Sequence, residues 1–262
     1  MMHILYFLIS LAATAIGALT GMGGGVIIKP ALDALGGLDA ANIGILSSVT
    51  VFTMSLVSTA KQARQKAEIN LKMAIPLAAG SLLGGVAGER MLTVIIEAAN
   101  ANSTVVIVQN SCLALIIIII FIYMGKGKRC PSLNLQGILP ALLAGVLLGT
   151  ISSFLGIGGG PINVALIIFL FGCGIKTAAV CSIITILFAQ ASKLAFVLVS
   201  GAFFSHDLTM LPFMVVGAVI GGWAGSQLNK TLPEKTVEKV FNNVQVLVFL
   251  ICMYNIFQNL IL

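Results

Sequence analysis

A cluster of glycines occurs twice in the sequence, and each copy interrupts an apolar stretch. The first copy is Gly21-Met22-Gly23-Gly24-Gly25, and the second, 135 positions later, is Gly156-Ile157-Gly158-Gly159-Gly160. Three consecutive glycines disfavour a continuous helix. Inside a membrane, the backbone groups exposed by such a break need partners in the protein or in a wet cavity. Matched breaks in the two halves of a chain indicate the binding site of a transporter.

The composition indicates a membrane protein. The chain has 262 residues, of which 59% are hydrophobic and only 8% are charged, and its mean hydropathy is +1.11. A soluble domain carries charges on about a quarter of its residues. The net charge of +6 would suit nucleic acid, but the basic residues gather in short loops between apolar segments. That distribution is typical of membrane topology, so we expect a lipid bilayer rather than nucleic acid as the partner.

The apolar segments follow the same order in both halves. In the first half they lie at about 3–20, 26–37, 40–60, 73–89 and 104–124, and in the second at about 136–154, 161–172, 175–200, 207–227 and 240–261. The segment after each glycine cluster is too short to cross a ~30 Å hydrocarbon core as a helix. We predict an all-α polytopic membrane bundle with broken or re-entrant helices at the glycine clusters. Residues 1–130 form the first membrane repeat and residues 131–262 the second, and the first segment is retained rather than cleaved as a signal peptide.

The duplication extends beyond the glycine clusters. Ser47-Ser48-Val49-Thr50 aligns with Ser182-Ile183-Ile184-Thr185 at the same offset of 135. At an offset of 137, a stripe of four glycines recurs, namely Gly80, Gly84, Gly85 and Gly88 matched by Gly217, Gly221, Gly222 and Gly225. Small residues three and four apart allow two membrane helices to approach closely, so we expect both stripes to be packing surfaces.

The basic loops predict how the chain crosses the membrane. Three stretches, 61–72, 126–129 and 230–239, hold ten of the fourteen Lys and Arg residues. We place all three in the cytoplasm. If each short segment and its predecessor form a hairpin, both termini lie outside and the second half begins inside. The two halves are then inverted repeats, an architecture typical of alternating access.

The glycine clusters are the first candidates for substrate binding. A short helix that begins at a glycine turn presents backbone amides and a positive partial charge to an anion. We therefore expect an anion site near six glycines: Gly23, Gly24, Gly25, Gly158, Gly159 and Gly160. The alternative is tight packing of crossed helices.

Small polar side chains lie close to these clusters or on the matching helices. Hydroxyl and amide donors suit an oxyanion that must be held and then released, and the candidates are Ser47, Ser48, Thr50, Asn163, Ser182, Thr185 and Gln190. The alternative is that the Ser and Thr hydroxyls bond the backbone of their own helix.

Three charged residues lie inside apolar segments. Lys193 is far from either end of its segment, where a charge costs about 2.5–3.5 kcal/mol on insertion scales and needs a partner or a wet cavity. It suits an anion pathway, and the alternative is snorkelling to an interface. Lys29 and Asp33, four residues apart, either neutralise each other or take part in substrate or proton coupling.

The sequence shows no set of residues typical of catalysis. It lacks a Walker loop, an HExxH motif and Cys or His spacing typical of metal sites, and its five cysteines include no CxxC pair. We expect neither an enzyme nor a resident cofactor or metal.

The repeated Gly-x-Gly-Gly-Gly helix end, the Ser-Ser-Val-Thr run and the GxxxGGxxG stripe together resemble the TauE/SafE sulfite exporter family. This resemblance covers essentially the whole chain. It implies transport of sulfite or a related organosulfur anion such as sulfoacetate across the bacterial cytoplasmic membrane. The halves are not equivalent, since Pro161 has no counterpart at Val26 and Lys193 aligns with Ser58.

Two classes of function fit these patterns. The leading hypothesis is a secondary transporter that exports a small sulfur oxyanion, because an anion leaving a negative interior gains about 2.3 kcal/mol per charge per 100 mV. The alternatives are proton- or sodium-coupled uptake of an organic anion, or a passive anion channel. The sequence predicts no oligomeric state.

Overall fold

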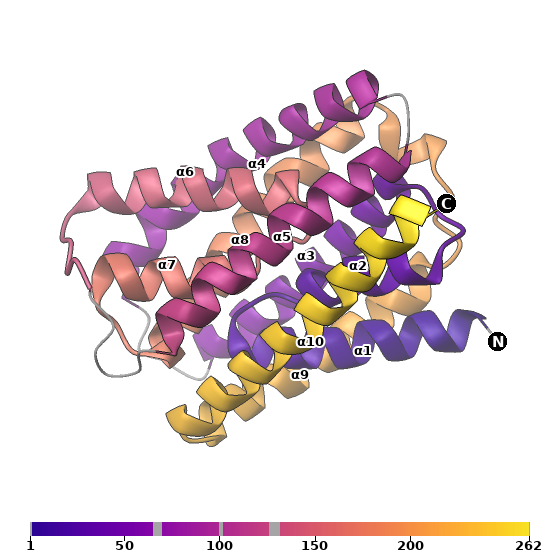
Figure 1. The fold of residues 1–262 in the computed structure, drawn as a ribbon. Helices are drawn as coiled ribbons and strands as arrows, with labels where there is room; N and C mark the ends of the chain where they lie inside the picture. Colours follow the sequence, from indigo (N-terminus) through magenta and orange to yellow (C-terminus); the bar gives the residue numbers. More distant parts are fainter. Residues whose placement is uncertain (1, 65–69, 100–101, 126–131, 262) are drawn as a thin grey trace.

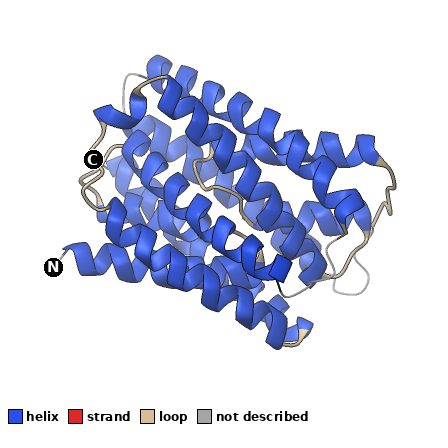
Figure 2. Cartoon of the chain, turned by 180° about the vertical axis from the view of Figure 1, so that it is seen from behind, coloured by secondary structure: helices blue, strands red, loops and turns tan. Residues whose placement is uncertain are grey.

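The computed structural model describes residues 2–64, 70–99, 102–125 and 132–261 (Figure 1). These residues form helices and loops without a strand, which confirms the predicted all-α class (Figure 2). The first half contains α1 (Met2–Thr20), α2 (Gly25–Leu35), α3 (Ala40–Arg64), α4 (Leu71–Ala99) and α5 (Asn102–Met124). The second contains α6 (Ile138–Phe154), α7 (Pro161–Phe171), α8 (Ile175–Val199), the 3-10 turn η2 (Ala202–Ser205), α9 (Leu211–Thr231) and α10 (Glu234–Ile261).

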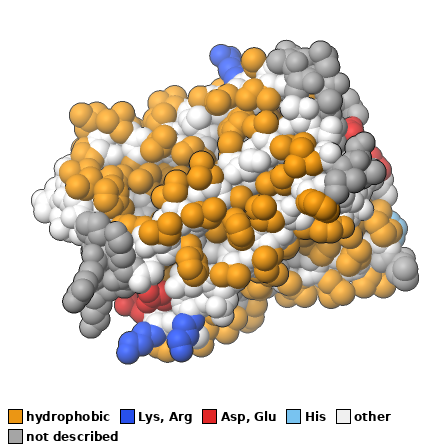
Figure 3. All heavy atoms as spheres, in the orientation of Figure 1, with side chains coloured by type: hydrophobic (Ala, Val, Ile, Leu, Met, Phe, Trp, Pro, Cys, Tyr) orange, Lys and Arg blue, Asp and Glu red, His pale blue; other side chains and the backbone are white. Residues whose placement is uncertain are grey.

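Helix length and surface chemistry confirm a polytopic membrane protein. Within the described residues, seven helices are long and apolar enough to cross a membrane: α1, α3, α4, α5, α8, α9 and α10. Large apolar side chains cover the flanks of the bundle, where lipid tails replace water as the solvent (Figure 3).

The helices break at the glycine clusters, as the sequence predicts. α1 ends at Thr20 and α2 begins at Gly25, while α6 ends at Phe154 and α7 begins at Pro161. The short helices α2 and α7 have 11 residues each, about 16 Å at 1.5 Å per residue, and cannot span the bilayer. Each therefore folds back from its glycine turn inside the bundle.

The predicted end of the fourth helix is wrong. The apolar segment predicted at 73–89 continues as α4 to Ala99. The predicted segment stops at about residue 89, where Glu89 and Arg90 add charge to the sequence, but both charged side chains have partners on α8. Glu89 meets Lys193, and the Arg90 guanidinium lies 5.7 Å from the ring centroid of Phe196. With these charges accommodated and no glycine or proline to stop it, the helix continues.

Both glycine stripes pack against a helix of the other half. A Cβ atom added at Gly84 would overlap the carbonyl oxygen of Val146 in α6, and one at Gly221 would meet that of Leu11 in α1 at 2.6 Å. Val146 and Leu11 are themselves 135 positions apart, so the two stripes make equivalent contacts. The prediction that the stripes are packing surfaces is confirmed.

The helix starts lie at two opposite ends of the bundle. At one end His3 of α1 contacts Met210 before α9, and both chain termini lie there (Figure 1). At the other end α6 begins beside the start of α4, and Lys176 of α8 donates to the carbonyl of Lys230. We call these the terminal end and the basic end. α1 and α6 thus begin at opposite ends, as inverted repeats require, and the repeats themselves stay a prediction.

The described basic residues support a common side for two of the three basic loops. Lys and Arg side chains gather at the basic end, where α9 meets α10 (Figure 3). Lys72 lies at the same end, at the start of α4. The loop 126–129 lies outside the described residues, as does Lys66. The cytoplasmic placement of the basic end stays a prediction.

A substitution in a glycine stripe tests whether the close packing of α4 on α6 stabilises the fold. Gly84→Leu should force α4 away from α6 and destabilise the fold by about 1–3 kcal/mol, the usual cost of overpacking. Gly44→Ala is the control, because no atom lies within 4 Å of the added methyl group and alanine favours helix. Melting temperatures of both variants in one detergent check the prediction, and an unchanged value for Gly84→Leu contradicts it.

Candidate functional site

The two glycine turns meet each other in the middle of the bundle. A Cβ atom at Gly25 would overlap the carbonyl oxygen of Ile157, and one at Gly23 would lie 3.1 Å from that of Gly158. From the other side, a Cβ atom at Gly159 would lie 3.2 Å from the carbonyl oxygen of Met22. The turns therefore touch backbone to backbone, across 135 positions of sequence.

Two short helices begin at this contact. The residues preceding α2 and α7, Gly24 and Gly160, have no side chain to cap the helix. The start of a helix carries about half a unit of positive charge. In α7 the first residue is Pro161, which has no N–H, and the Asn163 backbone amide already donates to the Gly160 carbonyl at 3.1 Å, so the helix dipole rather than a row of free amides supplies this charge. Both helices therefore direct positive potential toward the meeting turns. The tight packing of the turns is therefore observed, and anion binding by the same glycines stays a prediction.

Buried polar atoms without partners surround the turns. The Ser47 hydroxyl lies beside Gly25, and the Gln190 amide lies beside Gly158. Both side chains are 0% exposed, yet neither the Ser47 hydroxyl nor either end of the Gln190 amide has a hydrogen-bond partner. The amide nitrogen of Asn163, in the first turn of α7, is also unpartnered. Such atoms are expensive to bury, and they are available to a ligand.

The remaining predicted hydroxyls already have partners. Ser48 donates to the Gly44 carbonyl at 2.6 Å, Thr50 to the Leu46 carbonyl at 2.7 Å and Thr185 to the Cys181 carbonyl at 2.9 Å. These bonds within one helix match the alternative that Ser and Thr satisfy their own backbone.

Ser182 links a helix to a glycine turn. Its hydroxyl donates to the Gly21 carbonyl at 2.6 Å, which ties α8 to the first glycine turn. Ser182 therefore positions the site.

Lys193 is paired inside the protein and does not snorkel. The side chain is 1% exposed, and its Nζ lies 2.9 Å from Glu89 Oε2. This contact is an ion pair without hydrogen-bond geometry, so the oxygen still lacks a donor. The Ser153 carbonyl oxygen lies 3.5 Å from the same ammonium.

Lys29 and Asp33 form a second buried ion pair, next to Gly156 of the second glycine turn. Their charged atoms are 3.4 Å apart, and their side chains are 2% and 1% exposed. Asn110 donates to Asp33 at 3.2 Å, and Asn255 donates to Asn110 at 3.3 Å. A Cβ atom at Gly156 would lie 3.3 Å from the Lys29 side chain, so this pair borders the site.

The sequence identified Asp33 as a partner for Lys29, but it missed the partner of Lys193 and the amides that support Asp33. Glu89, Asn110 and Asn255 were not singled out, although each is a polar side chain inside a long apolar helix. Their location inside apolar helices is the sequence signal that could have identified them, because a buried charge or amide in a membrane helix needs a partner.

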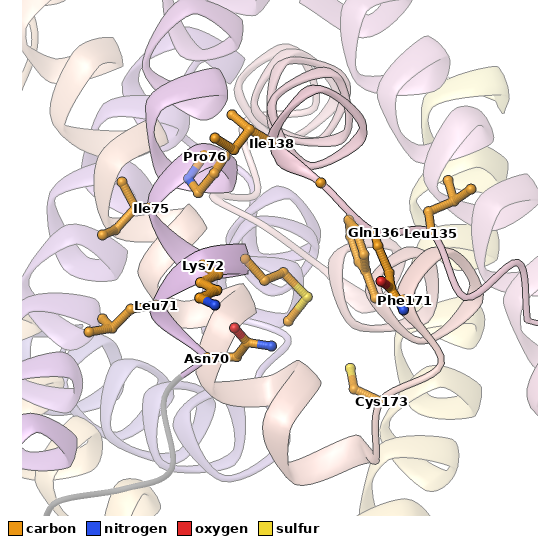
Figure 4. Close-up of a pocket in the computed structure, with 12 residues that line it drawn as sticks. Asn70, Leu71, Lys72, Ile75, Pro76, Leu135, Gln136, Ile138, Phe171 and Cys173 are labelled. Atoms are coloured by element: carbon orange, nitrogen blue, oxygen red, sulfur yellow. The ribbon is translucent and has the colours of Figure 1, made fainter.

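A large hollow lies away from the glycine turns, at the basic end (Figure 4). It opens between the start of α4, the start of α6 and the end of α7, and its lining includes Lys72, Gln136 and Phe171. Cys173 also borders it, and burial raises the pKa of this thiol to about 11. The thiol therefore stays protonated, and a poor nucleophile, at neutral pH.

Comparison with protein families decides the identity. Residues 6–252 match the family described as sulfite exporter TauE/SafE. The chain belongs to this family. Comparisons with curated proteins and with solved structures gave no match. A TauE/SafE chain with seven long apolar helices is a multi-pass membrane transporter, and the family implies small sulfur-containing anions as cargo.

The unpartnered amide of Gln190 gives a test that separates binding from folding. Gln190→Leu removes a buried unsatisfied group, so the melting temperature should hold or rise. If the amide binds substrate, transport should nevertheless fall at least tenfold. Gln62→Leu is the matched control, because this buried amide is also unpartnered but lies toward the basic end of α3. Equal transport by both variants would exclude a binding role for Gln190.

Proposed function

We propose that this TauE/SafE protein exports sulfite or a related small organosulfur anion by alternating access. The proposed site lies where the two glycine turns meet. The observation that supports it most strongly is the convergence of two uncapped helix starts with the unpartnered polar atoms of Ser47, Asn163 and Gln190.

The balance of charge suits an anion that is bound and then released. Each of the two buried lysines is paired with one carboxylate, so the ion pairs add little net charge. The attraction then comes from backbone amides, hydroxyls and amide side chains. Such neutral donors bind an oxyanion without the strong charge-assisted bonds of an arginine cluster.

Export by this site needs no energy source beyond the membrane potential. The sequence carries no nucleotide-binding motif. A single negative charge that leaves a negative interior gains about 2.3 kcal/mol per 100 mV. A proton or sodium ion is therefore not required for outward movement, whereas uptake against the potential would require one.

Alternating access follows if the two halves are inverted repeats that move against each other. We place the basic end in the cytoplasm, the termini outside and the protein in the bacterial cytoplasmic membrane. The two glycine turns lie at the contact between the halves. Each turn belongs to a hairpin of one half, α1–α2 or α6–α7, and α1 and α6 pack against α9 and α4 of the other half. A movement of one half then changes access to the site from both sides.

One alternative has an observation in its favour. Asp33 is a buried carboxylate beside the site, and unpartnered side-chain oxygens of Gln109 and Asn255 lie on the helices around it. Carboxylate and amide oxygens suit a coupling cation, so anion uptake coupled to sodium or protons is the second candidate.

Charge movement measured on a solid-supported membrane tests the leading proposal. Proteoliposomes are exposed to steps of sulfite, thiosulfate, sulfoacetate, sulfate and chloride. We expect a saturable current with sulfite. Gly24→Leu and Gly159→Leu should abolish it, because the first side chain would push the first glycine turn away from Thr14 of α1, and the second would collide with Ile186 of α8 at the contact between the turns. Gly44→Ala should retain it.

The other outcomes distinguish the alternatives. Isotope uptake without current would indicate electroneutral, ion-coupled transport. Continuous single-channel current would indicate a channel. Neither current nor uptake with any sulfur anion would refute this substrate class.

A further inference from the structure

The chain makes the same contact between helices twice, once as an ion pair and once as a pair of hydroxyls. Lys193 of α8 meets Glu89 of α4, whereas Ser58 of α3 shares a short hydrogen bond with Ser226 of α9. Ser58 and Lys193 are 135 positions apart, and Glu89 and Ser226 are 137 apart. These are the offsets that relate the glycine clusters and the glycine stripes. The two contacts are therefore counterparts.

The surroundings of the two contacts also correspond. Near the ion pair, a Cβ atom at Gly88 would lie 3.0 Å from Cβ of Ser153. Near the hydroxyl pair, a Cβ atom at Gly225 would lie 2.8 Å from Cβ of Ala18. Ser153 and Ala18 are again 135 positions apart. The packing is the same at both places, and the chemistry differs.

The two contacts lie toward opposite ends of the bundle. Ser58 and Lys193 each lie eighteen residues after the first residue of their helix, about 27 Å along it. α3 begins at the terminal end, where Asn42 donates to the Asp207 carbonyl at 2.9 Å, and α8 begins at the basic end. The ion pair therefore lies toward the terminal end and the hydroxyl pair toward the basic end, with the glycine turns between them.

The ion pair can separate only if its lysine finds another anion. Lys193 is 1% exposed, and removing the partner of a buried charge is strongly unfavourable. Glu89 is 13% exposed, so its side chain is less enclosed by protein than that of Lys193. An oxyanion bound beside Gln190, about one turn before Lys193 on α8, would replace Glu89 as the partner of Lys193. The Glu89 side chain would then turn toward water. The hydroxyl pair carries no charge and opens without such an exchange.

We propose that Lys193 and Glu89 form an anion-operated gate on the terminal side of the site, with Ser58 and Ser226 as its uncharged counterpart on the basic side. This inference rests on the proposed function for its place in the cycle. During export the anion enters past the hydroxyl pair and replaces Glu89 as the partner of Lys193. Separation of the ion pair then opens a path from the site to the terminal side. After release the ion pair reforms, and the empty protein closes on that side.

Cysteine accessibility tests the gate independently of transport. In a chain whose five native cysteines are replaced, the Ser153→Cys variant places a thiol beside the ion pair, and Ala18→Cys places one beside the hydroxyl pair. Both native side chains are 0% exposed. Labelling by a membrane-impermeant maleimide is measured from the terminal side, with sulfite, thiosulfate, sulfoacetate, sulfate or chloride present.

We expect a transported anion to accelerate labelling of Ser153→Cys at least fivefold. Adding Glu89→Gln should give fast labelling without anion and leave less than twofold anion dependence. Adding Ser226→Ala, the matched control, should leave the anion dependence intact. The Ala18→Cys thiol should stay unlabelled from the terminal side. Anion-independent labelling of Ser153→Cys in a protein that transports would overturn the gate.

A charge exchange separates gating from mere stabilisation. The double variant Lys193→Glu with Glu89→Lys keeps an ion pair, so its melting temperature should stay within a few degrees. It places a carboxylate next to the site, so transport should fall below a tenth. Full transport by this variant would show that the pair is only structural.

The same measurements distinguish a failure of the gate from a failure of the proposed function. If another anion of the panel opens the gate and sulfite does not, the proposed substrate fails and the gate stands. If no anion opens it and none is transported, both proposals fail.

Discussion

The contact between the two glycine turns is the constraint on which the rest of the structure depends. At Gly25 and Gly23 one backbone approaches another so closely that a side chain would overlap a carbonyl group or lie against it. Backbone groups released from helices at this depth cannot be left to lipid, because an unsatisfied amide there costs several kcal/mol. The opposing turn and the helices around it enclose those groups, and the short helices α2 and α7 thereby acquire starts that face the same small region.

Close approach of the surrounding helices keeps this region enclosed. The two glycine stripes bring α4 onto α6 and α9 onto α1, with backbone against backbone in both places. Because lipid tails provide no hydrophobic force between helices, such close packing, together with hydrogen bonds such as that from Ser182 to Gly21, holds the bundle. The two buried ion pairs add specificity rather than net attraction, since desolvation offsets much of their Coulomb energy. The two halves also differ here, with Lys193 and Glu89 at one contact and two serines at the other.

Sequence reasoning succeeded where a local pattern forces a physical result. Runs of apolar residues fixed the helix order, and three consecutive glycines fixed the two breaks. It failed at the end of α4, because the predicted apolar segment stopped at about residue 89, where the charged Glu89 and Arg90 follow the apolar run. In the folded protein Glu89 is paired, and the helix runs ten residues further. The same ambiguity affected the hydroxyls, since Thr50 and Ser47 look alike in sequence. Thr50 donates to the Leu46 carbonyl, while the Ser47 hydroxyl makes no hydrogen bond and lies beside Gly25.

The sequence by itself therefore determined the class of the protein, its helical segments, the duplication and the positions of the breaks, because each depends on composition or spacing along the chain. The tertiary structure alone decided that the two breaks touch. It also decided which polar atoms around them stay without a partner, and which carboxylate neutralises each buried lysine. These properties depend on distances between residues that are far apart in sequence, and such distances are set only when the helices pack.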